Sequence, residues 1–109
     1  MTFEERLAEA ARDVDADNLE EAHEKASALA REYPEEPRIA FILGHCHLKA
    51  GRPETAYYLY RYAQKFKDYN APQLWNQIGM SLAEMARDDD AEGWYNRALN
   101  RQPNDVTYS

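Results

Sequence analysis

The strongest constraint on the fold of this chain is an internal repeat with a spacing of 35 residues. Four pairs of like residues keep this spacing: Gly44 and Gly79, Ala56 and Ala91, Tyr60 and Tyr95, and Ala63 and Ala98. A fifth pair, Ala22 and Ala56, is 34 residues apart. A fixed period of this length is typical of repeat architectures, in which one unit cannot bury its apolar face alone. The sequence therefore predicts a stack of like units, each covering the next.

The last copy of the repeat shows how one unit can be built. A first apolar set recurs at positions i, i+3 and i+7, which is one face of a helix: Trp75, Ile78 and Leu82. A small–large–small set follows on a second stretch: Ala91, Tyr95 and Ala98. Gly79 lies on the first face, where the missing side chain lets a neighbouring helix come close, and the ring of Tyr95 can fill the space. We expect an antiparallel helix pair that ends before Pro103, because proline cannot extend a helix.

The spacing of this stretch resembles the tetratricopeptide repeat (TPR), a helix–turn–helix unit of about 34 residues with the pattern W-x₂-L-G-x₂-Y, then A-x₃-F, then P. The resemblance covers nearly the whole chain as three repeats, at about 3–36, 37–71 and 72–105. The second copy has Ala40 where the third has Trp75, with Phe41 beside it. In the first copy Ala10 takes the place of the glycine but follows Glu9, and a shift by one residue, with Leu7 and Ala11 in the key roles, fits the apolar stripe better. The resemblance implies an all-α fold, an α–α superhelix (TPR solenoid) of three helix–turn–helix repeats with about six helices in a single domain.

Turn signals locate the ends of the helices. The predicted helices cover about 3–14, 19–33, 37–50, 53–67 and 73–86, and a sixth begins at about 88. Asp17 or Asn18 can cap the second helix, and Pro53 suits the first position of the fourth. The acidic run from Asp88 to Asp90 complements the positive N-terminal end of the sixth helix. A metal site is the alternative interpretation of that run, although three adjacent residues on a helix do not face one point.

Length and charge limit the kind of protein. A chain of 109 residues makes one domain the default expectation, and the absence of an apolar run of about 18 residues argues against a membrane span. The single cysteine, Cys46, fits a reducing compartment, so we expect a cytoplasmic location. Residues 1–36 hold 12 acidic and 4 basic residues, whereas the remainder carries a net charge of +1. This acidic block disfavours nucleic acid as a partner. It is either a solvated helical surface or a surface that steers a basic protein.

Residues with catalytic or metal-binding chemistry are sparse. The sequence contains no nucleophile–base motif, no glycine-rich phosphate loop and no metal-ligand spacing, so we expect a protein without catalytic activity and without a cofactor. The nearest candidate is His45-Cys46-His47, but two histidines two positions apart on a helix point in different directions. We therefore expect Cys46 to be a small core residue. His23 lies among three glutamates and is expected to be a lone surface residue.

The function that remains is recognition of another protein. In the TPR family the first helix of each pair lines a concave face that receives an extended peptide or a helix. The resemblance implies that eight residues line this face: Phe41, His45 and Leu48 from the third helix, and Gln73, Asn76, Gln77, Met80 and Ala83 from the fifth. The amides can pair with a peptide backbone, and the apolar side chains can receive apolar groups. The alternative is that Phe41 and Met80 are ordinary core residues. The positions with which chaperone-tail binders of the family hold a terminal carboxylate carry no cation here, so such tails are not expected as ligands.

A second surface and the last helix leave further functions open. Tyr58 and Tyr62 lie four residues apart on the outer face of the fourth helix, where they either form a contact patch or lie flat on the surface. The sixth helix carries Trp94, Tyr95, Ala98 and Leu99, and nothing after it can cover them all. Either the chain is a fragment of a longer array, or this face pairs with a partner. The leading expectation is a protein-interaction module. The alternatives are a small secretion-type TPR chaperone that shields an apolar partner segment, and self-assembly through the sixth helix and the Tyr58/Tyr62 face.

Overall fold

The structure, a computed structural model, describes residues 1–100 of the chain. This part contains six α-helices, one short 3₁₀-helix and no strand, so the prediction of an all-α fold is confirmed. The α-helices are α1 (Phe3–Asp15), α2 (Leu19–Glu32), α3 (Pro37–Lys49), α4 (Pro53–Gln64), α5 (Pro72–Glu84) and α6 (Asp88–Asn100), and the 3₁₀-helix η1 is Lys67–Tyr69. The predicted end of the third repeat, including Pro103, lies outside the described residues.

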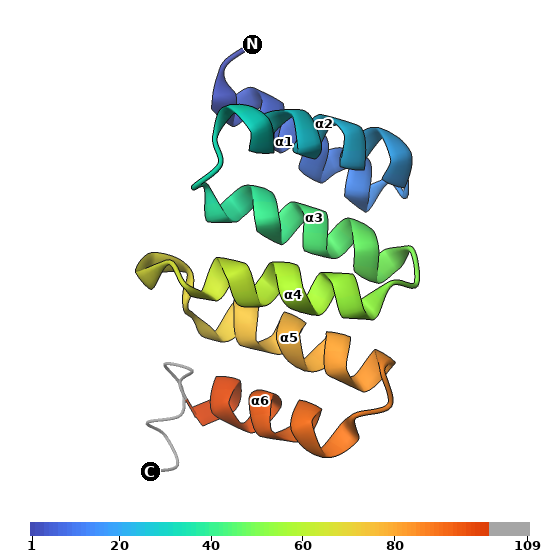
Figure 1. Ribbon diagram of the computed structural model, residues 1–109, viewed down its shortest axis with the longest axis vertical. Helices are drawn as coiled ribbons and strands as arrows, with labels where there is room; N and C mark the ends of the chain where they lie inside the picture. Colours follow the sequence, from blue (N-terminus) through green and yellow to red (C-terminus); the bar gives the residue numbers. More distant parts are fainter. Residues whose placement is uncertain (101–109) are drawn as a thin grey trace.

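The helices follow one another along the long axis of the molecule (Figure 1). Each α-helix packs against the next one in the chain, and α1 also contacts α3. The molecule measures 46 × 28 × 24 Å along its principal axes. Local contacts of this kind are what a chain of short helices with short turns produces, because sequential elements cover each other's apolar faces.

The turn inside each helix pair is built in the same way. One residue with a positive φ follows each first helix: Asp17 (φ 64°), Gly51 (φ 81°) and Ala86 (φ 60°). The next backbone N–H in each turn donates to a carbonyl five residues back: Asn18 to Asp13 at 2.8 Å, Arg52 to His47 at 2.8 Å and Arg87 to Leu82 at 2.9 Å. This is the bond of a helix C-terminus that closes on a left-handed residue. The 34- and 35-residue spacing of the sequence therefore reappears as a repeated backbone geometry.

The apolar core consists of two clusters that meet at α3. The N-terminal cluster joins α1 and α2 to one face of α3 and includes Leu7, Ala10, Val14, Ala22, Ala26, Leu29, Ile39, Ile42 and Cys46. The C-terminal cluster includes Ala40, Ala56, Tyr60, Ala63, Leu74, Trp75, Ile78, Leu82, Ala91 and Ala98. Ala10 is fully buried and Ala11 only partly, which favours Ala10 at the glycine position, whereas Leu7 of the shifted register is also buried.

The two glycines of the repeat each lie under a tyrosine ring: the sequence predicted this contact for Gly79 and Tyr95, and Gly44 and Tyr60 repeat it. A Cβ atom built on Gly44 would lie 2.5 Å from Cε1 of Tyr60, and one on Gly79 would lie 2.6 Å from Cε1 of Tyr95. Carbon atoms in contact normally keep about 3.5–4.0 Å. Each ring thus occupies the space that any larger residue would need.

Two helix ends differ from the sequence prediction. Helix α4 ends at Gln64 and not near residue 67, because Phe66 has extended backbone angles (φ −89°, ψ 121°) and the chain then turns through η1. This turn brings the ring of Tyr69 against the ring of Phe41 with centroids 5.5 Å apart. At the start of α2, Asn18 is the N-cap residue but its side chain makes no capping hydrogen bond. Asp17 takes the left-handed conformation, so the expected side-chain cap is absent.

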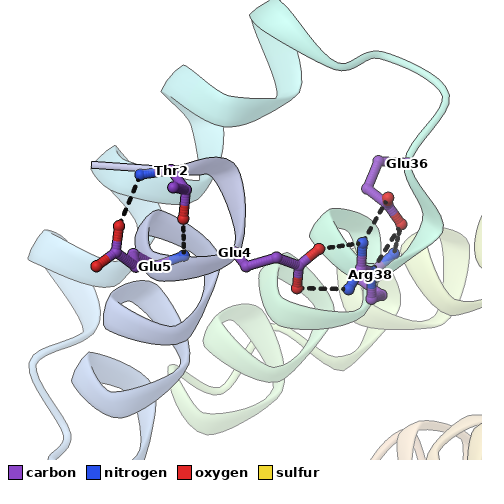
Figure 2. A network of polar contacts seen from close by, with 5 residues as sticks. All are labelled: Thr2, Glu4, Glu5, Glu36 and Arg38. Atoms are coloured by element: carbon purple, nitrogen blue, oxygen red, sulfur yellow. Dashed lines mark hydrogen bonds and ion pairs between the residues drawn. The ribbon is translucent and has the colours of Figure 1, made fainter.

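Some residues of the acidic block form ion pairs with other helices of the same chain. Arg38 on α3 binds the Glu4 carboxylate of α1 with two hydrogen bonds of 3.0 and 3.1 Å, and it also binds Glu36 (Figure 2). Between α1 and α2, Arg6 pairs with Glu32, and Lys25 pairs with Asp13 and Glu9. Thr2 and Glu5 close a capping box at the start of α1 (Figure 2). Several acidic residues therefore tie α1 to its neighbours and do not simply face solvent.

The described helices are too short and too polar to cross a membrane.

Candidate functional site

One small cavity brings together predicted site residues from two different helices. It has a volume of about 110 Å³ and is lined by Phe41 of α3, Gln73 and Leu74 of α5, and the connecting residues Asp68, Tyr69 and Ala71. Phe41 and Gln73 are both among the eight residues predicted to line a binding face. The sequence did not predict Asp68, Tyr69, Ala71 or Leu74 as lining residues. The first three lie in the segment before α5, which was interpreted as a linker, and Leu74 lies on α5 itself.

Aromatic rings form the wall of this cavity. The ring of Phe41 lies 5.5 Å from Tyr69, 4.4 Å from His45 and 5.7 Å from Tyr60, measured between centroids. Phe41 is half-buried and packs against the C-terminal core cluster. It thus has both roles that the sequence left open, a core contact on one side and a cavity wall on the other.

A buried hydrogen bond holds His45 beside this wall. His45 Nδ1 and the hydroxyl oxygen of Tyr60 are 2.6 Å apart, and Tyr60 is fully buried. Burial lowers the pKa of His45 below its ordinary value and raises the pKa of Tyr60. Both side chains are therefore neutral near pH 7. The neutral pair fixes the His45 ring, which is itself half-buried.

The other predicted site residues differ in accessibility. Leu48 is half-buried and packs against the C-terminal core cluster, and Asn76 and Gln77 are also half-buried. Gln73 and Ala83 are exposed, and Met80 is 43% exposed, which is high for a large apolar residue. Apart from Phe41 and Gln73, none of the eight lines the 110 Å³ cavity. The accessible part of the predicted face is thus the exposed side of α5 together with this cavity.

Charged groups of both signs lie near the cavity. Asp68 is exposed and lines the cavity. Burial raises the pKa of Tyr69, with Arg38 acting against this shift and Glu36 supporting it, so both charges lie within electrostatic range of the Tyr69 hydroxyl. Arg38 already binds Glu36 and Glu4. Its single positive charge is therefore shared between two carboxylates.

The second predicted surface is present on α4. Tyr58 is 72% exposed and Tyr62 is 38% exposed. Both line an open depression of about 490 Å³ with Arg61, Gln64, Lys65 and Asn70. The Tyr62 hydroxyl donates a hydrogen bond of 3.1 Å to the carbonyl of Pro34. Tyr62 thus has a contact within the fold, whereas Tyr58 extends into solvent.

The last described helix has an uncovered apolar face. Leu99 is 55% exposed and Tyr95 is 37% exposed. Tyr60, which holds the equivalent repeat position on α4, is fully buried because α5 packs over it. Of the four α6 residues expected to be uncovered, Tyr95 and Leu99 are exposed, whereas Trp94 is half-buried and Ala98 is buried.

A larger depression lies between α2 and the end of α3, and the sequence did not predict it. It has a volume of about 940 Å³, and its lining includes His23, Cys46, His47 and Arg52. The rings of His23 and His47 meet edge to face with centroids 5.1 Å apart, so His23 is not isolated, although it lies on this open surface. Cys46 is buried as expected, and burial raises the pKa of its thiol, which opposes the reactive thiolate form.

Neither a metal site in the described residues nor a known family is identified for this chain. No group of three or more His, Cys, Asp or Glu side chains within residues 1–100 is arranged to hold a metal ion. Comparison of the chain with protein-family models, with curated protein sequences and with solved structures found no match. The fold and the site thus define an all-α protein with a small aromatic-walled cavity between α3 and α5.

Proposed function

We propose that this chain is a non-catalytic protein–protein interaction module of the TPR type. In this proposal its helix pairs form a solenoid, and α3 and α5 contribute to a groove that binds a peptide or a helix of a partner protein. The observation that carries the proposal is the cavity lined by both Phe41 and Gln73, since residues chosen from the sequence as groove residues meet there across two helices.

The repeated geometry supports the TPR assignment. The three left-handed turn residues, Asp17, Gly51 and Ala86, recur at nearly the repeat spacing. The two glycine–tyrosine contacts recur in the same way. Repeated local geometry of this kind is expected where each unit is one supersecondary element that packs on the next.

The chemistry of the exposed side of α5 supports a peptide ligand. The exposed Gln73 and the half-buried Asn76 and Gln77 carry both donors and acceptors, which is what a peptide backbone requires. Met80 is exposed, and methionine adapts to apolar side chains of different shape. A protein partner is favoured over nucleic acid, because residues 1–36 are strongly acidic. We also propose a cytoplasmic location, on the ground of the single cysteine.

Differential capture from a lysate of the source organism tests this function. The baits are the unchanged chain, a Gln73→Glu/Met80→Glu variant and a Tyr58→Glu control. All three altered positions are exposed, so each variant is expected to keep the helical content of the unchanged chain by circular dichroism. Partners lost with the α5 variant and retained with the control are the expected result. Partners retained by both folded variants would overturn the groove proposal.

Self-assembly is the second candidate, and the exposure of Leu99 and Tyr95 on α6 favours it. A helix face with this much apolar surface is stabilised by a second apolar surface. Light scattering over a range of concentrations tests the idea. A dimer that becomes a monomer in a Leu99→Lys variant would support assembly through α6, and a monomer at all concentrations would exclude it.

A further inference from the structure

We propose that the cavity between Phe41 and Leu74 is the anchor subsite of this groove, and that it receives one aliphatic side chain of a partner peptide with a lysine or arginine next to it. This inference rests on the proposed function and specifies the chemistry of its ligand. We name the cavity the anchor pocket and define it by its lining residues: Phe41, Asp68, Tyr69, Ala71, Gln73 and Leu74.

The size of the anchor pocket selects the side chain. Its volume of about 110 Å³ is below the roughly 150 Å³ of an apolar protein cavity that takes up benzene. A branched aliphatic side chain of the size of valine or leucine suits this space, whereas a tryptophan ring does not. The Phe41, Tyr69 and Leu74 side chains supply apolar walls, and removing an aliphatic group from water against such walls is favourable.

The walls of the anchor pocket are fixed before a ligand arrives. Phe41 packs against the core and against the rings of His45 and Tyr69. Leu74 is almost fully buried. The side chain of Asn70, which directly precedes Ala71, accepts a hydrogen bond of 2.6 Å from the indole N–H of Trp75. A preformed pocket loses little conformational entropy on binding.

Polar groups at the mouth define the rest of the ligand. Gln73 is exposed beside the apolar walls, and its amide can pair with the peptide group next to the anchoring side chain. Asp68 lines the pocket and forms no ion pair with another residue of the described chain. An arginine or lysine next to the aliphatic residue of the peptide would supply a positive charge for the Asp68 carboxylate.

The surrounding charges favour the same ligand. Arg38 is the cation within range of Tyr69, and Glu4 and Glu36 already bind it (Figure 2). These two carboxylates outnumber the one guanidinium that they bind, and Asp68 adds a further carboxylate in the lining of the pocket itself. A basic peptide is attracted by this surplus of negative charge, and an acidic peptide is repelled.

The test begins with a phage-displayed library of random 12-residue peptides selected on the unchanged chain. The expected consensus has Val, Leu or Ile adjacent to Lys or Arg. A synthetic consensus peptide carrying a fluorophore is then titrated with the chain and its variants, and binding is followed by anisotropy. Asp68→Lys is expected to weaken binding about tenfold, because it replaces attraction at the rim with repulsion. Exchanging the basic residue of the peptide for glutamate should restore binding to this variant.

Two further variants separate the outcomes. Ala71→Leu places a larger side chain in the anchor pocket and should abolish binding, while Lys67→Arg, which keeps the charge next to Asp68 and lies outside the lining, should leave binding unchanged. Peptides that depend on Met80, which lies outside the lining, but bind equally to the Asp68→Lys and Ala71→Leu variants would overturn the anchor pocket and leave the groove intact. If no selected peptide depends on Met80 or Gln73, the proposed function itself is overturned.

Discussion

A methyl group has no room at position 44, whereas at position 93 it meets no atom within 4 Å. We predict that Gly44→Ala lowers the free energy of unfolding by about 1–3 kcal/mol, because the added carbon collides with the buried Tyr60 ring. Gly93→Ala, on the exposed face of α6, should raise it by about 0.5–1 kcal/mol, since alanine loses less backbone entropy in a helix. Urea unfolding followed by circular dichroism measures both changes.

Gly79 provides a control for the steric argument. Its added carbon would also collide with a tyrosine ring, but Tyr95 is 37% exposed and can move toward solvent. Gly79→Ala should therefore destabilise the protein less than Gly44→Ala does. Equal losses at the two positions would show that ring mobility does not decide the cost.

The histidines of α3 make stability depend on pH. Burial lowers the pKa of His45 and of His47, where Arg52 and His23 add to the effect. The unfolded chain takes up protons near the ordinary value of about 6.5, and the folded chain does so only at lower pH. The contribution of these histidines to the free energy of unfolding is therefore complete above about pH 6.5 and is lost as the pH drops below it. Urea midpoints at pH 7.5 and 5.5 measure this fall, which should be smaller in a His45→Gln/His47→Gln variant. An unchanged fall would assign the effect to other groups.

At the residue scale, the sequence predicted contacts that recur with the repeat and missed those that do not. The position of Tyr95 over Gly79 followed from one small and one large residue at matching places on two helices. The Tyr69–Phe41 and His23–His47 ring contacts each join segments more than 20 residues apart and occur once. No local pattern marks such pairs, because they depend on how the helices stack.

At the scale of the elements, the turn inside each helix pair requires a left-handed residue, and only one of the three is glycine. We predict that Ala86→Gly stabilises the protein by about 0.5–1 kcal/mol, because alanine with φ of 60° has a steric strain that glycine lacks. Gly51→Ala should destabilise it by about 1 kcal/mol for the same reason. Thermal unfolding curves of the two variants check the signs. A loss of stability in Ala86→Gly would mean that unfolded-state entropy outweighs the strain.

The ends of the helices show which local signals are reliable. The starts of α3 and α4 were predicted at Pro37 and Pro53, and α5 begins at Pro72, one residue before the predicted start. Proline fixes a helical φ and lacks the N–H that the first turn cannot use, so its signal is purely local. The early end of α4 was not predicted, because η1 is held by the packing of Tyr69 on a helix far away in the sequence.

At the scale of the whole molecule, the acidic block was only partly interpretable from sequence. Its net charge suggested either a solvated face or a steering surface. The structure shows that Glu4, Glu9 and Glu32 pair across helices with Arg38, Lys25 and Arg6. These partners are 16 to 34 positions away, so pairing could not be inferred without the stacking order. The anchor pocket was missed for the same reason, except for Phe41 and Gln73.

The division of the core into two clusters predicts how the molecule opens. Trp75→Ala in the C-terminal cluster should cost about 3–5 kcal/mol, and Leu29→Ala in the N-terminal cluster about 2–5 kcal/mol. Contacts run mainly between consecutive helices, so each loss should act first on its own cluster. Native-state hydrogen exchange should show faster exchange in α4, α5 and α6 for Trp75→Ala, and in α1 and α2 for Leu29→Ala. The amides of α3 should respond to both variants, because α3 contributes side chains to both clusters.

Uniform loss of protection in either variant would mean that the six helices unfold as one cooperative unit. An unchanged unfolding midpoint in Trp75→Ala would contradict the role of α5 in the core.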